Sequence, residues 1–177
     1  MVEYNAPIRD YDFLFNEMFD AIPIAQRLGY DFDSDFFSML TEGWADHTKE
    51  VWLPINQLGD REGLKFNDGN ISMPIEFKSA YNKSKEGGWL STACKPEHGG
   101  MGVPVFFQAV TWAEIGTSTN MAMSVLPALT LGVYDVLIEH GESSLVDYFA
   151  THLASGDWSG TMCLTEPHAG TDLGIIS

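Results

Sequence analysis

The amino-acid sequence predicts a mainly α-helical domain up to about Gly156, followed by the first strand and turn of a second domain. Three observations support this fold class. Apolar residues recur at spacings of three and four along most of the chain before Gly156, which is the period of amphipathic helices. Glycine and proline gather mainly between these segments. After Trp158 the helical period stops, and a short apolar run, residues 162–164, ends in a polar turn.

Length and composition describe a globular, acidic protein. The chain has 177 residues and is 45% hydrophobic and 19% charged, enough to bury a core. Nine Lys and Arg residues against 25 Asp and Glu residues give a formal net charge of −16. This charge argues against a nucleic-acid or anionic-membrane surface, but not against a small anionic ligand, which needs only a few local donors. No apolar run approaches the roughly 18 residues of a membrane span, and the N-terminus lacks a signal-peptide pattern. With two unpaired thiols, Cys94 and Cys163, a cytoplasmic protein is expected.

The first part of the chain predicts two helices. Asp10 is a candidate cap for the first, whose apolar stripe holds Tyr11, Leu14, Phe15, Met18 and Phe19. The second begins near Asp33 and continues through Pro54, which should kink or split it. Its apolar stripe holds Phe36, Phe37, Leu40, Trp44, Val51, Trp52, Ile55 and Leu58. His47 lies on the polar side of this stripe, so a surface position is expected.

Two stretches favour turns. Asp68 and Gly69 form a dipeptide typical of two-residue hairpins, which predicts a short, weak hairpin with Lys65 and Ile71 on either side. Residues 94–104 are too rich in glycine and proline for a helix. Their Gly-Gly-Met-Gly, residues 99–102, is a weak candidate for a phosphate loop, because no strand precedes it and no Gly-Lys-Ser/Thr follows.

Further helices are expected after the hairpin. One begins at Pro74 and ends at Gly87, and another runs from Pro104 to about residue 115. Residues 121–140 are apolar on nearly all sides, which predicts a buried central helix that stops at Gly141. The last helix begins at residues 142–144, which supply its cap, and ends at residues 155–157.

The turn after the last helix has the composition of a ligand-holding loop. Pro167 has no N–H and biases Glu166 toward an extended conformation, so the strand should end there. Gly170 permits a positive φ or a close approach of the backbone to a ligand. Thr165 and Thr171 add hydroxyl groups. Such a turn suits a polar, planar or anionic ligand, but an ordinary exit from a strand has a similar composition. One strand cannot pair alone, so residues 157–177 are expected to be the start of an incomplete second domain.

Residues 164–172, Leu-Thr-Glu-Pro-His-Ala-Gly-Thr-Asp, resemble the signature Thr-Glu-Pro-x-Ala-Gly-Ser-Asp of the acyl-CoA dehydrogenase family. Residues 96–102 look like the family's Pro-x-x-Tyr-Gly-Gly-x-Gly loop, and residues 112–116 like its following helix. His140-Gly141 and residues 153–156 stand at the usual distances before the signature. Residues 4–10 and 59–63 look more like the larger branch that includes methylthiopropionyl-CoA dehydrogenases.

This resemblance implies an all-α N-terminal domain, residues 1–156, and the start of a β-barrel middle domain, residues 157–177. It implies an FAD-dependent oxidoreductase of fatty-acid metabolism. In the family, a glutamate removes the α-proton of an acyl-CoA while the β-hydride passes to the flavin, giving the α,β-enoyl-CoA. That glutamate belongs to a C-terminal domain, so no catalytic residue is expected here and this segment alone should be inactive. Implied partners are an acyl-CoA substrate, an electron-transfer flavoprotein or similar acceptor, and further copies in a homodimer or homotetramer.

The resemblance also implies the residues of the site. The expected flavin contacts are Met162, Leu164, Thr165, Gly170 and Thr171. Thr171 replaces the usual serine and keeps its hydroxyl, so it is also expected at the substrate. His168 replaces a common glycine and is either a loop residue or a ligand contact. Glu166 should support the turn with its side chain. Residues that could line the acyl pocket are Phe106, Met121, Met123 and Leu126, although a core position is the favoured interpretation for each.

Two other readings stay open at this point. The first is a family relative with a similar flavin site that serves as an oxidase or as a binding protein without dehydrogenase activity. A plain helical bundle without a ligand would explain the periodicity but not the ordered set of motifs.

Overall fold

Helices make up most of the structure, a computed structural model that describes residues 3–108 and 121–176, with side chains described from residue 128 on in the second range. The mainly α fold class is therefore confirmed. The elements are α1 (Ile8–Asp12), η1 (Phe13–Met18), α2 (Ala21–Arg27), α3 (Ser34–His47), η2 (Thr48–Trp52), α4 (Leu53–Glu62), β1 (Lys65–Asn67), β2 (Asn70–Ser72), α5 (Ile75–Glu86), η3 (Pro96–His98), α6 (Val105–Phe107), α8 (Met121–His140), α9 (Ser143–Ser155) and η5 (Leu173–Ile175).

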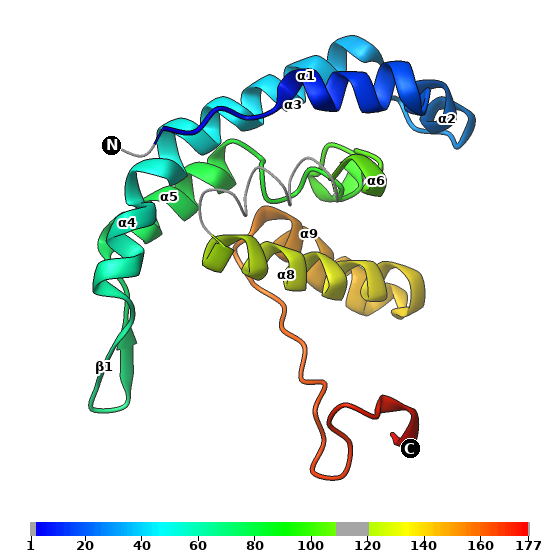
Figure 1. Ribbon diagram of the computed structural model, residues 1–177. Coiled ribbons are helices and arrows are strands. Elements are labelled where there is room, and N and C mark those ends of the chain that lie inside the picture. Colours follow the sequence, from blue (N-terminus) through cyan, green and yellow to red (C-terminus); the bar gives the residue numbers. More distant parts are fainter. Residues whose placement is uncertain (1–2, 109–120, 177) are drawn as a thin grey trace.

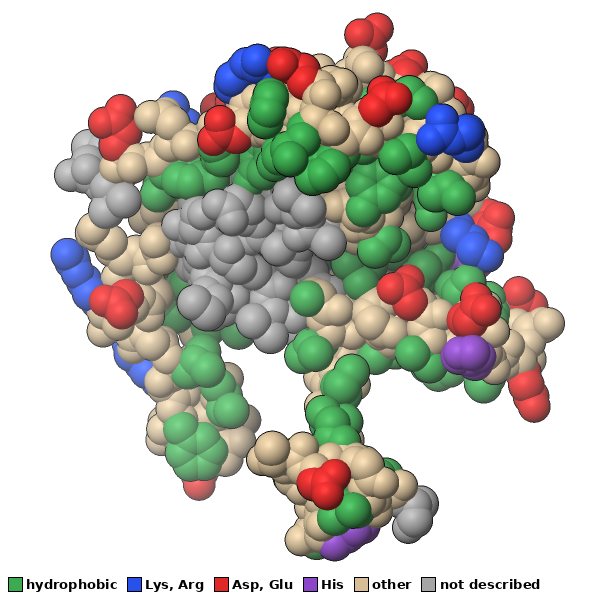
Figure 2. Space-filling view, turned by 45° about the vertical axis from the view of Figure 1, so that its right-hand side comes forward, with side chains coloured by type: hydrophobic (Ala, Val, Ile, Leu, Met, Phe, Trp, Pro, Cys, Tyr) green, Lys and Arg blue, Asp and Glu red, His purple; other side chains and the backbone are tan. Residues whose placement is uncertain are grey.

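A helical body carries two projections (Figure 1). α1, η1 and α2 lie along α3, while α8 and α9 form a helical hairpin on the other side of α6. The β1–β2 hairpin projects from the end of α4. The chain after α9 runs out of the body as a C-terminal arm, residues 161–176. Figure 2 shows hydrophobic side chains along both projections.

The first core cluster is aromatic and joins α1, η1 and α3 to α6. Phe37 is 1% exposed and lies between Phe15 and Phe107, with ring centroids 5.1 and 5.3 Å away. Phe32 packs on Phe107 at 5.4 Å. Aromatic side chains bury large apolar areas, so this cluster fixes the N-terminal helices against the loop that precedes α6. Five of the eleven buried residues of the cluster come from the predicted apolar stripes of the first two helices, namely Tyr11, Phe15, Phe37, Leu40 and Trp44.

The helix predicted through Pro54 is interrupted in an unexpected way. α3 passes into a π-helical segment, η2, and then into α4, with Pro54 in the first turn of α4. A proline has no N–H to donate, and a π segment immediately before it changes the hydrogen-bond pattern without breaking the helix. At the start of α3, the Asp33 carboxylate accepts a hydrogen bond from the backbone N–H of Phe36 at 2.8 Å, as its cap position predicts.

Two predicted caps are wrong. α1 begins after Pro7, without a side-chain cap, and Asp10 lies in its first turn. α9 begins after Glu142, whose side chain accepts no cap hydrogen bond. The termination signals are confirmed, because α5 ends at Gly87 and α9 ends at Gly156, whose φ is 73°. The predicted helix at residues 104–115 is described only as α6, and its remainder lies outside the described residues.

His47 is not the surface residue predicted. Its ring packs between Trp44 and Trp89, with centroid distances of 5.7 Å to both. Its Nε2 lies 2.7 Å from the Oγ of Ser84, a fully buried residue of α5. Burial, and then the charge of Lys83, lower the pKa of His47 to about 4. The polar side of the helix is covered because α5 packs across it.

The prediction of the hairpin is confirmed, whereas the predicted burial of α8 is wrong. Phe66 pairs with Ile71 in the β1–β2 ladder, and both turn residues, Asp68 and Gly69, have positive φ values, so the predicted hairpin is confirmed. α8 packs against α9 through one face, but Val136 is 62% exposed. The prediction that this helix is buried on all sides is wrong for the part of α8 whose side chains are described, from residue 128 on. α8 lies at an edge of the body (Figure 1).

Candidate functional site

The motif-bearing segment leaves the helical body directly after α9. Figure 1 shows it as the orange-to-red segment that runs away from the helices and ends in a turn and the short η5 helix. The backbone N–H groups of residues 161–165 donate no hydrogen bond to the described residues. A strand is defined by pairing, so the strand predicted at residues 162–164 is not formed among the described residues. Residues 162–164 are thus an apolar segment without a pairing partner among the described residues.

Backbone hydrogen bonds close the signature turn. The N–H of Glu166 donates to the carbonyl oxygen of Ala169 at 2.9 Å, and the N–H of Ala169 donates to the carbonyl oxygen of Glu166 at 3.1 Å. Pro167 and His168 are therefore the central residues of a tight turn. The exposed side chain of Glu166 makes no hydrogen bond within the described residues. Among these residues the turn is therefore supported by the backbone of Glu166, and not by its side chain as expected. Ala169 is 1% exposed and packs inside the turn.

Gly170 follows the turn in an open environment. Two reasons for a glycine were expected here, a left-handed backbone and close approach of a ligand. The first is excluded, because the φ of Gly170 is not positive. A Cβ at this position would meet no atom within 4 Å. Neither the turn nor the packing within the described residues requires a glycine here. The other expected reason, close approach of a ligand, stays a prediction.

The predicted flavin-contact residues all face solvent. Met162 and Leu164 are 62% and 47% exposed, and the hydroxyls of Thr165 and Thr171 make no hydrogen bond within the described residues. The turn places Thr165 and Gly170 next to each other on its two legs, while Met162 lies further back along the arm. A planar ring with polar edges fits this set of hydroxyl donors, free backbone N–H groups and apolar side chains. Near the end of the arm, the Oδ1 atom of Asp172 accepts a hydrogen bond from the N–H of Gly174 at 3.1 Å.

The glycine-rich loop at residues 96–102 is not a phosphate loop. The N–H groups of Gly99, Gly100 and Gly102 donate to backbone carbonyls of the same loop, which leaves them unavailable to an anion. Tyr134 of α8, which the sequence did not single out, supports the loop. Its hydroxyl accepts from the N–H of Lys95 at 3.0 Å and lies 2.7 Å from Nδ1 of His98. Burial raises the pKa of Tyr134.

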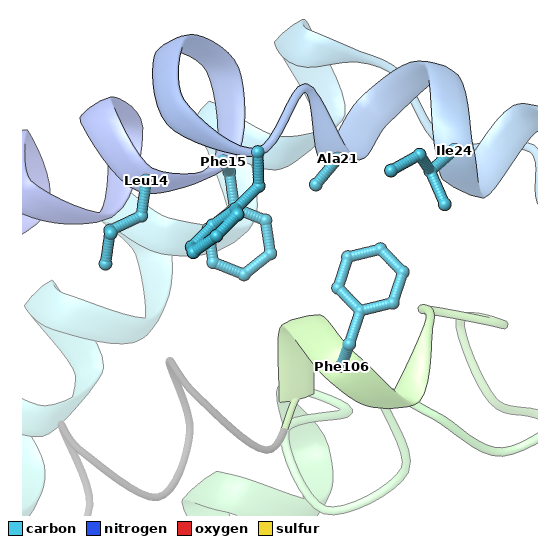
Figure 3. Close-up of a pocket in the computed structure, with 6 residues that line it drawn as sticks. Leu14, Phe15, Ala21, Ile24 and Phe106 are labelled. Carbon is cyan, nitrogen blue, oxygen red and sulfur yellow. The ribbon is translucent and has the colours of Figure 1, made fainter.

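A second candidate is an apolar pocket of about 300 Å³ between the N-terminal helices and α6 (Figure 3). It is lined by Leu14, Phe15, Phe19, Ala21, Ile24 and Phe106. Without a polar group, the pocket can accept apolar atoms but cannot orient a reacting group. Phe106 also packs on Phe15 at 5.8 Å, so it is part of the core as well as the pocket wall. The other acyl-pocket candidates, Met121, Met123 and Leu126, have side chains outside the described residues.

Two kinds of site are absent from the part of the chain that the structure describes. No three His, Cys, Asp or Glu side chains gather closely enough there to hold a metal ion. None of its helices combines the length and apolar character that a membrane span needs.

The sequence is related to curated dehydrogenases. No family model matches the chain. A 3-methylmercaptopropionyl-CoA dehydrogenase of Ruegeria pomeroyi is 33% identical over 98% of this chain and 29% of its own length. A butyryl-CoA dehydrogenase of Syntrophomonas wolfei is 31% identical over 96% of this chain and 28% of its own length. A broad-specificity linear acyl-CoA dehydrogenase of Mycobacterium tuberculosis is 29% identical over 98% of this chain and 28% of its own length.

Over nearly its whole length the chain is similar to members of the acyl-CoA dehydrogenase family. The family resemblance read from the motifs is thereby confirmed, and a methylmercaptopropionyl-CoA dehydrogenase is among the relatives. The chain spans less than a third of the length of these relatives, 28–29%.

Proposed function

We propose that this chain is the N-terminal part of an FAD-dependent acyl-CoA dehydrogenase, which oxidises an acyl-CoA thioester to the α,β-enoyl-CoA. The observation that supports the proposal is the exposed turn at residues 165–171, with free hydroxyls and an open glycine, in a chain related to dehydrogenases along its whole length. In this division, residues 1–156 form the all-α domain and residues 157–177 begin a β-barrel middle domain.

The turn residues are proposed to bind and orient the flavin. The hydroxyls of Thr165 and Thr171 would donate hydrogen bonds to polar atoms of the flavin, and Gly170 would leave room for the ring beside the backbone. Met162 and Leu164 cover its apolar part and exclude water from it. Thr171 also contacts the acyl-CoA. When bound, FAD accepts the β-hydride of the substrate as its α-proton leaves. The base that takes this proton is proposed to be a glutamate outside these 177 residues.

The wider assignments are proposals of the same kind. Relatives named for methylmercaptopropionyl, butyryl and linear acyl-CoA point to a short or medium acyl thioester as substrate. An electron-transfer flavoprotein or similar protein would reoxidise the flavin. A homodimer or homotetramer and a cytoplasmic location complete the proposal.

The test uses the complete protein encoded by the gene that contains this chain. The protein is loaded with FAD and titrated without oxygen with butyryl-CoA and with 3-methylthiopropionyl-CoA. We expect the absorbance of oxidised flavin to be lost and an enoyl-CoA to form. A yellow protein that no acyl-CoA bleaches would indicate a binding protein, and oxygen consumption without another acceptor would indicate an oxidase. A colourless protein that cannot be loaded with FAD would refute the flavin site itself.

A further inference from the structure

Residues 156–160, here called the anchor segment, join α9 to the C-terminal arm and are held by α5. The hydroxyl of Tyr81 donates to the carbonyl oxygen of Gly156 at 2.8 Å. The ammonium of Lys85 pairs with the carboxylate of Asp157, and this contact lowers the pKa of Asp157. Tyr81 and Lys85 stand four residues apart in one helix, so both reach the anchor segment from the same face.

α8 and α9 hold the other end of the anchor segment. The N–H of Gly160 donates to Oγ1 of Thr130 at 3.1 Å, and Gly160 is buried against α8. A Cβ on Gly160 would lie 2.6 Å from Cγ2 of Val133, so only glycine allows the chain to pass this close. The N–H of Trp158 donates to the carbonyl oxygen of His152 at 3.1 Å, and the two rings stack at 4.2 Å.

The hydrogen bonding changes abruptly after Gly160. The N–H groups of residues 161–165 donate nothing to the described residues, and the next backbone hydrogen bond is the turn closure at Glu166. No hydrogen bond or ion pair within the described part of the chain fixes the direction of this stretch. The anchor segment is therefore the last point before the signature turn at which hydrogen bonds hold the described chain to the helices.

We propose that Tyr81 and Lys85 are positioning residues for the flavin turn, which they act on through Gly156 and Asp157. This inference rests on the proposed function, because it assigns a use to the placement of the turn. Neither side chain touches the turn, and both lie about 75 residues before the anchor segment, with separations of 75 and 72 residues in the two contacts.

The first test measures the placement of the arm without any flavin. Of the two cysteines in these 177 residues, Cys163 is exposed and Cys94 is buried. A spin label therefore attaches at Cys163, in the arm itself, once any cysteines outside these residues are replaced by serine. A second label on α9, introduced by Asp147→Cys, gives a distance between body and arm. In the complete protein we expect Y81F/K85M to broaden or shift this distance distribution. The controls Y148F and K78M remove a hydroxyl and an ammonium that form no hydrogen bond or ion pair within the described residues, and should leave it unchanged.

The second test measures FAD binding to unlabelled complete protein. Y81F/K85M should raise the Kd for FAD about tenfold, which corresponds to about 1.4 kcal/mol, and should alter the visible circular dichroism of the bound flavin. The single variant K85R keeps the positive charge at this position, so its Kd for FAD should equal that of the wild type. Y148F and K78M again serve as controls.

The outcomes separate this inference from the proposed function. Wild-type protein that does not bind FAD refutes the proposed function, and the inference falls with it, while the label distances still report on the anchor. An unchanged distance distribution in Y81F/K85M overturns the inference even if FAD binds normally. A changed distribution with unchanged Kd and flavin spectrum also overturns it, because the anchor would then be structural only.

Discussion

The variant Gly170→Ala in the C-terminal arm should weaken FAD binding without lowering the stability of the fold. An added Cβ meets no atom within 4 Å and the backbone φ is not positive, so the free energy of unfolding should change by less than about 0.5 kcal/mol. If the flavin ring approaches the backbone here, the new methyl group occupies its space. Overpacking of this kind costs about 1–3 kcal/mol, so the Kd for FAD should rise between about fivefold and about 150-fold.

Gly160→Ala is the matched control for stability. Its Cβ would lie 2.6 Å from Cγ2 and 2.7 Å from Cβ of Val133, in a buried position. We expect a cost of about 1–3 kcal/mol in the free energy of unfolding, and therefore a lower Tm. Thermal unfolding and FAD titration of the complete protein give both quantities for each variant. The reasoning is refuted if Gly170→Ala binds FAD like the wild type, or if it loses as much Tm as Gly160→Ala.

Three further predictions concern individual side chains whose burial the structure shows. Phe37→Ala should cost about 3–5 kcal/mol in urea unfolding, because Phe37 is 1% exposed, while M39A, 59% exposed in the same helix, should cost little. A thiol reagent should modify Cys163 and spare Cys94 until the protein unfolds, since burial and then the charge of Asp135 raise the pKa of Cys94 to about 12; equal reactivity of both thiols in folded protein would contradict this. Because His47 has a folded pKa of about 4 and an ordinary value of 6.5, the unfolded chain takes up its proton first as pH falls. Stability should therefore be lost between pH 6.5 and 4 and retained above that window, and Tm should fall more steeply with acid in wild type than in H47Q.

Features set by neighbouring residues were predictable from the sequence. Asp33 caps α3 through a residue three positions away, and the Asp68-Gly69 turn needs only its own backbone angles. Gly156 ends α9 in a left-handed conformation, as a C-terminal glycine does. The signature turn is local in the same sense, because Glu166 and Ala169 close it between themselves.

Features that depend on packing between distant segments were not predictable. His47 reads as a surface residue until α5 brings Ser84 to it, 37 residues away. Tyr134 supports a loop 39 residues earlier, and Tyr81 reaches Gly156 across 75 residues. The apolar run at residues 162–164 has strand character, but the sequence of one segment cannot supply the partner that pairing requires.

As a proposed flavin site the arm would bind weakly by itself, because its own contacts are few. Two hydroxyls and the free backbone N–H groups of the turn offer hydrogen bonds of about 1 kcal/mol each. Association costs an estimated 4–15 kcal/mol in lost motion before interfacial side chains are ordered. Contacts from Thr165 and Thr171 alone fall short of the roughly 8 kcal/mol that a micromolar Kd represents. A turn of this kind becomes useful when it is already in place opposite other contacts, because ordering it then costs little. The hydrogen bond of Tyr81 and the ion pair of Lys85 provide that placement from the helical body.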